Sequence, residues 1–203
     1  MQAFWDSRYQ APDYAYGEAP NAFFAQELAK LRPGRLLLPA EGEGRNAVYA
    51  AKLGWEVTAF DYSAEGRQKA LRLAEKAGVA LRYQLLDIAD YIPDPESFEA
   101  IGLCFTHFTP ALRDPFFAKM VEALAPGGVL ILEGFHTQQL GYHSGGPKDE
   151  ALLFSVPLLA AAFSSLDIRW LHDAVVHLDE GPFHQGPAHV VQLIAYKKPQ
   201  PSL

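Results

Sequence analysis

The stretch RLLLPAEGEGRNAVYAAKLGWEVTAFD, residues 35–61, carries the clearest structural signal in the sequence. It begins with a short apolar run and continues through a turn that contains Gly42 and Gly44. A helical pattern follows, and then a second apolar run that ends at Asp61. Apolar runs that alternate with helical segments are typical of parallel strands covered by helices on both faces. The stretch therefore predicts a βαβ unit with a ligand-binding first turn.

The same alternation continues along the chain. A helix is predicted over residues 63–76, and a strand follows in VALRYQLL. The last two apolar runs lie close together and predict an antiparallel hairpin. We expect one doubly wound α/β domain over residues 1–203, with a mostly parallel, Rossmann-like sheet. The other predicted elements are helices over 21–31, 46–54, 110–124 and 156–163, and strands over 98–105, 127–135, 168–178 and 188–197.

Two segments fall outside this alternation. Residues 1–20 carry five aromatic side chains among Pro and Gly, which indicates an ordered aromatic arm rather than a helix. Residues 136–150 form a Gly-rich insertion after the fifth strand. We expect it to form a lid over the site, with a solvated turn as the alternative.

Composition limits the possible functions. The 203 residues are 49% hydrophobic and carry a net charge of −7, which disfavours non-specific binding to nucleic acid. We expect no signal peptide and no membrane span, because the opening residues contain no apolar run and no stretch approaches about 18 apolar residues. Cys104 is the single cysteine and lies in an apolar run that predicts a buried strand residue. We therefore expect a cytoplasmic protein with a small-molecule substrate and no membrane partner, and the sequence leaves the oligomeric state open.

The first turn fits two kinds of cofactor. Gly42 to Ala47 matches G-x-G-x-x-A, the fingerprint of dinucleotide binding, and an acid at the end of the next strand suits a ribose. However, the turn also carries Glu41 and Glu43, which repel a pyrophosphate. S-adenosylmethionine has a net positive charge, so carboxylates beside the turn favour its binding. Charge therefore predicts S-adenosylmethionine, with NAD as the alternative.

Two aspartates follow the second and third predicted strands. Asp61 is expected to accept hydrogen bonds from both ribose hydroxyls, with a helix cap as the alternative. Asp87 stands where the edge of an adenine would lie, and an ordinary loop acid is its alternative.

At these motifs the chain resembles class I S-adenosylmethionine-dependent methyltransferases of the tellurite-resistance (TehB-like) and thiopurine-methyltransferase-like branch. The similarity spans nearly the whole chain and includes WDSRY, YAYGEAPN, ALAPGGVLILEGF and GGPKD besides the first turn. The resemblance implies a seven-stranded sheet with its last strand antiparallel. Leu38 and Ala40 replace the leading acid and first glycine of the common D-x-G-x-G-x-G loop, so Glu41 would bind the methionyl ammonium instead.

The resemblance also implies that the arm closes over the cofactor through Trp5, Arg8, Tyr16 and Gly17, with Arg8 on the methionyl carboxylate. An ordinary surface salt bridge is the alternative for Arg8. The other residues expected around the cofactor are Ala40, Glu41, Gly42, Gly44, Arg45, Asn46, Asp61, Tyr62, Ser63, Asp87, Ile88, Cys104 and Phe105.

The candidate residues for the acceptor side lie near the carboxyl ends of predicted strands and in the insertion. His107 follows the fourth strand and is the candidate catalytic residue, with a passive structural histidine as the alternative. The candidate substrate residues are Phe108, Tyr142, Lys148 and His184. No metal site is expected, because His172 with His177 and His184 with His189 are odd separations that place side chains on opposite strand faces.

Together these features predict methyl transfer from S-adenosylmethionine to a small molecule. If the resemblance extends to substrate, the acceptor is a soft nucleophile of sulfur, selenium or tellurium. The alternatives are an NAD-dependent oxidoreductase and a non-catalytic module that binds S-adenosylmethionine.

Overall fold

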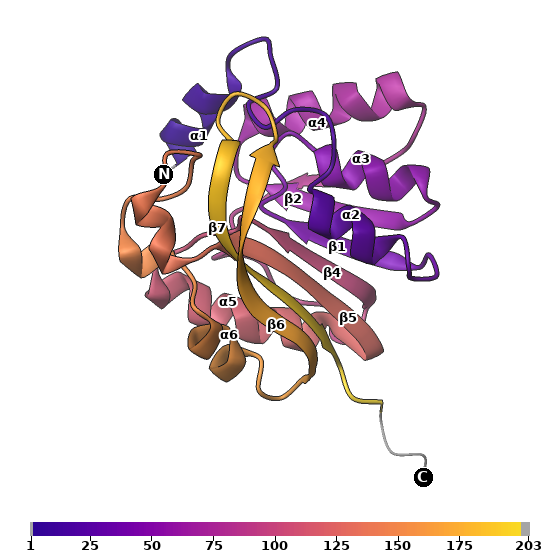
Figure 1. Cartoon of the computed structure of the whole chain (residues 1–203). Helices are drawn as coiled ribbons and strands as arrows, with labels where there is room; N and C mark the ends of the chain where they lie inside the picture. Colours follow the sequence, from indigo (N-terminus) through magenta and orange to yellow (C-terminus); the bar gives the residue numbers. More distant parts are fainter. Residues whose placement is uncertain (1, 200–203) are drawn as a thin grey trace.

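The computed structural model describes residues 2–199, so the two ends of the predicted domain, residue 1 and residues 200–203, lie outside the described residues. Its centre is a seven-stranded sheet with the strand order β3-β2-β1-β4-β5-β7-β6 (Figure 1). The predicted doubly wound α/β fold is therefore confirmed. The strands are β1 Arg35–Pro39, β2 Glu56–Asp61, β3 Arg82–Leu85, β4 Phe98–Cys104, β5 Leu124–Phe135, β6 Asp167–Asp179 and β7 Gln185–Tyr196.

Helices cover both faces of the sheet (Figure 1). On β1, Leu36 and Leu38 pack with the core beneath α2 and α3, whereas Leu37 packs with the core beneath α5 and α6. This alternation follows from the two-residue period of a strand, and it explains why β1 has three consecutive buried leucines. The helices are α2 Ala22–Leu28, α3 Arg45–Lys52 and α4 Ala64–Ala77 on one face, and α5 Pro110–Ala123 and α6 Val156–Ala162 on the other.

The helix boundaries follow local capping chemistry. Ser63 caps α4, because its Oγ accepts a hydrogen bond from the Gly66 N–H at 3.2 Å, and Gly78 ends the helix in a left-handed conformation. Asn21 caps α2 in the same way through the Phe24 N–H. The predicted helix over residues 21–31 nevertheless ends earlier, at Leu28. Boundaries set by a capping side chain were thus the easier ones to predict.

The C-terminal strands form the expected antiparallel hairpin. β7 lies between β5 and β6 and runs antiparallel to both. The loop between β6 and β7, residues 180–184, therefore reaches past the carboxyl end of β5. It is called the hairpin loop below. The strand order also reverses direction between β1 and β4, and such a switch point is where open α/β sheets bind ligands.

The prediction that the arm contains no helix was wrong for its first part. Residues Gln2–Tyr9 form the helix α1 (Figure 1). No proline or glycine occurs before Pro12, and the side chains of Trp5 and Tyr9, one helical turn apart, stack with ring centroids 5.4 Å apart. Tyr9 is buried, so tertiary packing holds a helix too short to be stable alone.

The Gly-rich insertion is fastened to β7. It contains two short 3₁₀ helices, η1 Thr137–Gly141 and η2 Glu150–Leu152. The side chain of Gln139 accepts a hydrogen bond from the His189 N–H at 2.8 Å and donates one to Ser144 Oγ at 3.0 Å. Ser144 Oγ in turn donates to the Pro187 carbonyl at 2.7 Å. The insertion thus covers the carboxyl end of the sheet as an ordered layer.

None of the helices within residues 2–199 combines the length and the apolar character that crossing a membrane requires.

Candidate cofactor and acceptor site

A cavity of about 540 Å³ lies at the carboxyl ends of β1, β2 and β4. Its floor is the switch point between β1 and β4, and its walls come from α1, the insertion and the hairpin loop. Of the predicted site residues, the lining includes Trp5, Arg8, Tyr16, Ala40, Glu41, Arg45, Asn46, Asp61, Tyr62, Cys104, Phe105, His107, Phe108, Lys148 and His184. Gly17, Gly42, Gly44, Ser63, Asp87, Ile88 and Tyr142 are absent from the lining.

The turn after β1 is held by close backbone contacts. Ala40 adopts a left-handed conformation, with φ of 49°, at the position where the common loop carries its first glycine. A Cβ on Gly44 would lie 2.5 Å from the Cβ of Ala70 in α4, so only glycine lets the turn approach that helix. Gly42 and Gly44 therefore set the shape of the turn through their close contacts with other segments, and they do not line the cavity.

Glu41 combines a structural role with exposure to the cavity. One of its carboxylate oxygens accepts the Ala47 N–H of α3 at 2.8 Å, and the other accepts from the Asn46 side chain at 3.3 Å. Burial raises the pKa of Glu41 to about 7, against the lowering effect of these hydrogen bonds. A cationic ligand beside Glu41 would favour its ionised form.

Asp61 ends β2 and lines the cavity. One of its oxygens accepts the Gly42 N–H at 3.1 Å, and the other accepts the Ser63 N–H at 2.8 Å. Each carboxylate oxygen keeps a further lone pair, as two hydroxyl donors would require. Burial raises the pKa of Asp61 to about 6, and the two N–H donors oppose that rise. Ser63 itself points away and caps α4.

Glu43 does not face the cavity, so the charge argument from the sequence was wrong for this residue. Its carboxylate pairs with Lys69 of α4 at 2.7 Å, and both side chains are 3% exposed. The other oxygen accepts the Ala15 N–H at 2.8 Å. Glu43 therefore ties the arm to α4, and Glu41 is left as the acid of the turn that faces the cavity.

Two contributions to the site were missed at the sequence level. Tyr9 stacks on Trp5 and covers the turn so closely that a Cβ on Gly42 would lie 2.5 Å from its hydroxyl. Thr106, after β4, lines the cavity with a buried hydroxyl that has no hydrogen-bond partner among the described residues. Residue type gives no signal for either role, because both depend on how distant segments meet.

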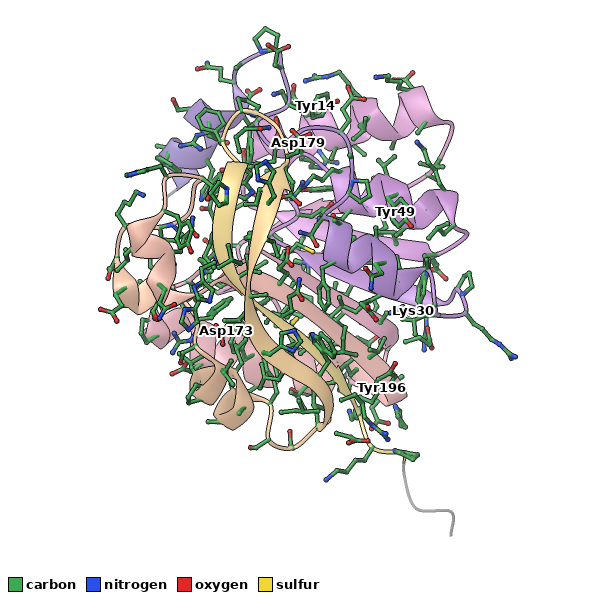
Figure 2. The ribbon with its side chains drawn as sticks, in the orientation of Figure 1. Tyr14, Lys30, Tyr49, Asp173, Asp179 and Tyr196 are labelled. Atoms are coloured by element: carbon green, nitrogen blue, oxygen red, sulfur yellow. The ribbon has the colours of Figure 1, made fainter. Side chains whose placement is uncertain are left out.

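The arm closes one side of the cavity. Arg8 donates a hydrogen bond to the Tyr16 hydroxyl at 3.2 Å, and its guanidinium lies 3.8 Å from the ring centre of Phe183 in the hairpin loop. Gly17 packs against Gly181 of the same loop. Figure 2 shows Tyr14 of the arm and Asp179 of β6 at the same end of the molecule. Arg8 thus lines the cavity, while Gly17 joins the arm to the hairpin loop.

The predicted adenine contacts lie outside the cavity wall. Asp87 is exposed, and its carboxylate accepts the N–H of Ala89 at 3.0 Å, which fits the ordinary loop acid that was its alternative. Ile88 is buried in the core beneath α5. Asp87 nevertheless lies near enough to Tyr62 and Asp61 to raise the pKa of both side chains.

The geometry of His107 speaks against its predicted catalytic role. Its Nδ1 lies 2.8 Å from the Leu152 carbonyl, and its Nε2 accepts the Phe135 N–H at 3.0 Å. Burial lowers the pKa of His107 to about 4. Both ring nitrogens are thus used to join the insertion to β5, and neither is free to accept a proton from a substrate.

The acceptor side of the cavity is aromatic. The His184 ring lies between Tyr16, Phe105 and Phe135, with ring centroids 4.5, 4.6 and 5.2 Å away. Lys148 and His143 of the insertion line the same space. Tyr142 instead packs near His189, away from the cavity. Burial raises the pKa of the Cys104 thiol, so this lining residue is not a thiolate.

A cluster of two histidines and one aspartate on β6, on β7 and directly after β5 was not anticipated. His136, Asp173 and His189 place ligand atoms within 4.8 Å of one another. However, His136 Nδ1 accepts the Gln138 N–H, so its neutral ring carries the proton on Nε2, and His189 Nε2 already contacts Asp173 at 2.7 Å. These bonds describe a hydrogen-bonded cluster rather than preformed metal ligands.

Parts of the chain are similar in sequence to known methyltransferases. Residues 39–128 match a family described as "Methyltransferase domain". A glycine/sarcosine N-methyltransferase from Halorhodospira halochloris is 34% identical over 134 residues, which are 64% of this chain and 47% of that protein. The chain thus spans about half the length of the curated relative it matches.

Solved structures share the fold at low identity. TehB from Haemophilus influenzae has a TM-score of 0.73 at 16% identity, over 97% of this chain and 67% of that one. The Burkholderia thailandensis 1,6-didemethyltoxoflavin-N1-methyltransferase, solved with bound 1,6-didemethyltoxoflavin and S-adenosylhomocysteine, has a TM-score of 0.62 at 20% identity, over 87% of this chain and 79% of that one.

The chain therefore shares the fold of these solved structures, and its residues 39–128 are similar to a methyltransferase domain. The turn between β1 and α3 and the acid at the end of β2 both lie inside the matched methyltransferase domain.

Proposed function

We propose that this protein transfers a methyl group from S-adenosylmethionine to a small-molecule acceptor. The observation that carries the proposal is the pair of acids, Glu41 and Asp61, that face one cavity at the switch point of the sheet. When bound, S-adenosylmethionine supplies a methyl carbon activated by a sulfonium. A cation and a ribose each find an acidic partner there.

The same contacts disfavour the NAD alternative. A dinucleotide needs free N–H groups at the N-terminus of the first helix for its pyrophosphate. Here the Gly42 N–H bonds Asp61, the Gly44 N–H bonds the Glu41 carbonyl, and the Ala47 N–H bonds the Glu41 carboxylate. A phosphate at this place would meet a carboxylate and occupied donors.

Each lining residue then has a task. Asp61 accepts from the two ribose hydroxyls, Glu41 accepts from the methionyl ammonium, and the Thr106 hydroxyl gains a partner. Arg8 is free to pair with the methionyl carboxylate without leaving Tyr16. Trp5 and Tyr16 exclude water, and holding the acceptor close to the methyl carbon supplies most of the rate.

Two observations bear on the chemical class of the acceptor, and the cavity volume limits its size. Similarity of the sequence motifs to the TehB-like branch favours a soft sulfur, selenium or tellurium nucleophile. The curated relative, a glycine/sarcosine N-methyltransferase, favours a small amine. The cavity of about 540 Å³ must hold the cofactor and the acceptor together. Either kind of acceptor must therefore be a small molecule.

Calorimetric titration with S-adenosylhomocysteine, S-adenosylmethionine and NADH tests the cofactor. Asp61→Asn keeps the side chain's shape but removes its charge, and we expect it to weaken both adenosyl ligands about 10-fold to 150-fold, which is about 1.5–3 kcal/mol. Asp167→Asn is the matched control, because Asp167 lies at the start of β6, outside the cavity lining, where it pairs with Arg169, and this variant should change affinity far less.

Three outcomes separate the candidate functions. Binding of NADH without the adenosyl ligands would refute the proposal. Binding of the adenosyl ligands without S-adenosylhomocysteine formation from any amine, thiol or selenite acceptor would favour a non-catalytic binding module. Binding and turnover together would support methyl transfer.

A further inference from the structure

The hairpin loop carries a buried histidine whose two ring nitrogens differ in their surroundings. His184 lines the acceptor side of the cavity and is 6% exposed. Its Nδ1 lies 3.2 Å from a carboxylate oxygen of Glu180. No described residue forms a hydrogen bond with Nε2. This contrasts with His107, in which both nitrogens are used.

Glu180 is itself held from three sides. The oxygen that faces His184 also accepts from the Arg45 guanidinium at 2.9 Å, and the other oxygen accepts from the Asn21 amide at 3.1 Å. Burial opposes its ionisation, but the hydrogen bond from His184 and the charge of Arg45 hold the pKa of Glu180 below its usual value. Glu180 is therefore a fixed carboxylate, and it keeps the proton of neutral His184 on Nδ1.

The free nitrogen is left to the cavity. With the proton on Nδ1, Nε2 carries a lone pair. A Cβ on Gly145 of the insertion would lie 2.8 Å from Cδ2 and 3.4 Å from Nε2 of His184, so the glycine leaves room beside this nitrogen. Phe105, whose ring packs on His184, directly follows β4 at the switch point. Nε2 thus lies on the side where the acceptor must meet the methyl group.

We propose that His184, positioned by Glu180, takes the proton from a methyl acceptor whose nucleophilic atom is protonated at neutral pH, such as an ammonium, a thiol or a phenol. This inference rests on the proposed methyl transfer. It narrows the acceptor, because an oxyanion such as selenite has a free lone pair and needs no base.

Proton transfer to His184 accompanies methyl transfer to the acceptor. The bond between the nucleophilic atom and hydrogen breaks, its electron pair stays on that atom, and the proton joins Nε2 to give an imidazolium. The freed pair forms the new bond to the methyl carbon, while the carbon–sulfur bond breaks with its electrons on sulfur. The imidazolium, stabilised by Glu180, returns the proton to water when the products leave.

Several charged groups surround His184 and set its proton affinity. Burial lowers the pKa of His184, the Glu180 carboxylate opposes this, and the charges of Arg45 and Arg8 add to the lowering. A pKa below the usual histidine value leaves the ring neutral at pH 7, as a base must be. Other titratable groups that line the same cavity include Tyr16, His107, His143 and Lys148.

Nitrogen-15 NMR of the histidine rings, in protein saturated with S-adenosylhomocysteine, tests the first half of the proposal. We expect neutral His184 to carry its proton on Nδ1 and to take a second proton on Nε2 reversibly as the pH falls. His107 is the internal control and should stay neutral at pH values where His184 titrates. Glu180→Gln should lower the pKa of His184, whereas Asp179→Asn, a neighbouring exposed carboxylate, should leave it unchanged.

Kinetics test the second half. S-adenosylhomocysteine formation is followed with glycine, 2-mercaptoethanol, phenol and selenite as acceptors. With a protonated acceptor, His184→Gln should lower kcat at pH 7 on the order of 10²-fold to 10⁴-fold, and the loss should shrink as the pH approaches the acceptor's own pKa. Glu180→Gln should shift the pH profile to lower pH. Affinity for S-adenosylhomocysteine should stay within about threefold in both variants, well under 1.4 kcal/mol.

The failures are distinguishable. If wild-type protein does not bind S-adenosylhomocysteine, the proposed function fails. If it binds while neutral His184 carries its proton on Nε2, or if His184→Gln and wild type share one pH profile, this inference alone is overturned. A preference for selenite that His184→Gln leaves intact would overturn it as well.

Discussion

At the scale of single residues, the Glu41 side chain has two roles, one in the fold and one in the cavity. Its carboxylate caps α3, as an acid at a helix N-terminus should, and the same carboxylate faces the cavity. When it is ionised, the Glu41 carboxylate repels an anionic ligand group and attracts a cationic one. The position of Glu41 therefore decides cofactor preference through charge rather than through shape.

The pKa of Glu41 makes cofactor affinity depend on pH. Burial raises this pKa to about 7, so the carboxyl becomes neutral as the pH falls through that value, and it then loses its attraction for the methionyl ammonium. We expect the Kd for S-adenosylhomocysteine to rise by up to about tenfold per pH unit below 7. Glu41→Gln should remove this step in calorimetric titrations and keep the one at about pH 6 that arises from Asp61. An unchanged pH dependence in the variant would contradict the assignment.

For His107 we predict an effect on stability and no effect on the pH dependence of turnover. His107→Phe keeps the ring that packs on Phe135 and Phe154, but it leaves the Leu152 carbonyl and the Phe135 N–H without partners. We expect a loss of about 2–4 kcal/mol in the free energy of unfolding, measured with urea. The pH profile of turnover should not change, since neither nitrogen is available to a substrate. A stable variant with a large loss of kcat would restore the catalytic interpretation.

At the scale of elements, the arm is held by charge as well as by aromatic packing. The buried pair of Glu43 and Lys69 fastens the arm, because the same carboxylate accepts the Ala15 N–H. Lys69 also donates to the Asp13 carbonyl at 2.6 Å. The turn after β1, the arm and α4 therefore meet at one buried ion pair, which lies behind the cavity rather than in it.

Breaking this pair from one side should release the arm. Lys69→Met leaves the Glu43 carboxylate buried without its cation, and we expect about 3–5 kcal/mol less stability toward urea and faster chymotryptic cleavage at the arm tyrosines. Lys76→Met on the same helix removes an exposed pair with Glu18 and should cost less than about 1 kcal/mol. Equal losses in the two variants would show that the buried pair has no special role.

At the scale of the whole molecule, the sequence was sufficient for the sheet and for the turn after β1. The two-residue period of the strands and capping residues such as Ser63 act locally, so they can be recognised without the fold. The switch point then follows from the order of the elements. Asp61 and Glu41, which the sequence analysis assigned to the cofactor, both line the cavity at this switch point.

The rest of the site depends on contacts between distant segments. Glu43 and Glu41 are two residues apart and equally acidic, yet the first pairs with Lys69 and only the second faces the cavity. His107 and His184 were both candidates at the acceptor side. What distinguishes them is the partner of each ring nitrogen, and Glu180, Leu152 and Phe135 supply those partners from elsewhere in the fold. Residue type and spacing contain no information on such pairing.

The closure of the cavity by distant segments yields the last prediction. The arm and the hairpin loop touch backbone to backbone, since the Phe183 N–H donates to the Ala15 carbonyl and Gly181 packs against Tyr16 and Gly17. Ligand binding should therefore slow amide hydrogen exchange in both segments together, and not only in the turn after β1. With S-adenosylhomocysteine at 100 times its Kd, stability should rise by about 2.7 kcal/mol, which corresponds to about 5–10 °C in Tm.

Gly181→Ala separates this coupling from cofactor binding itself. A Cβ at this left-handed position, with φ of 70°, would lie 2.8 Å from the Ala15 carbonyl oxygen and 2.7 Å from the Tyr16 carbonyl carbon, so the arm and the hairpin loop must move apart. In the variant, the ligand should still protect the turn after β1, while protection of residues 10–20 and 180–184 should be lost in both segments together. Protection that persists in one segment alone would mean that arm and loop close independently, because a shared backbone contact cannot release one partner and hold the other.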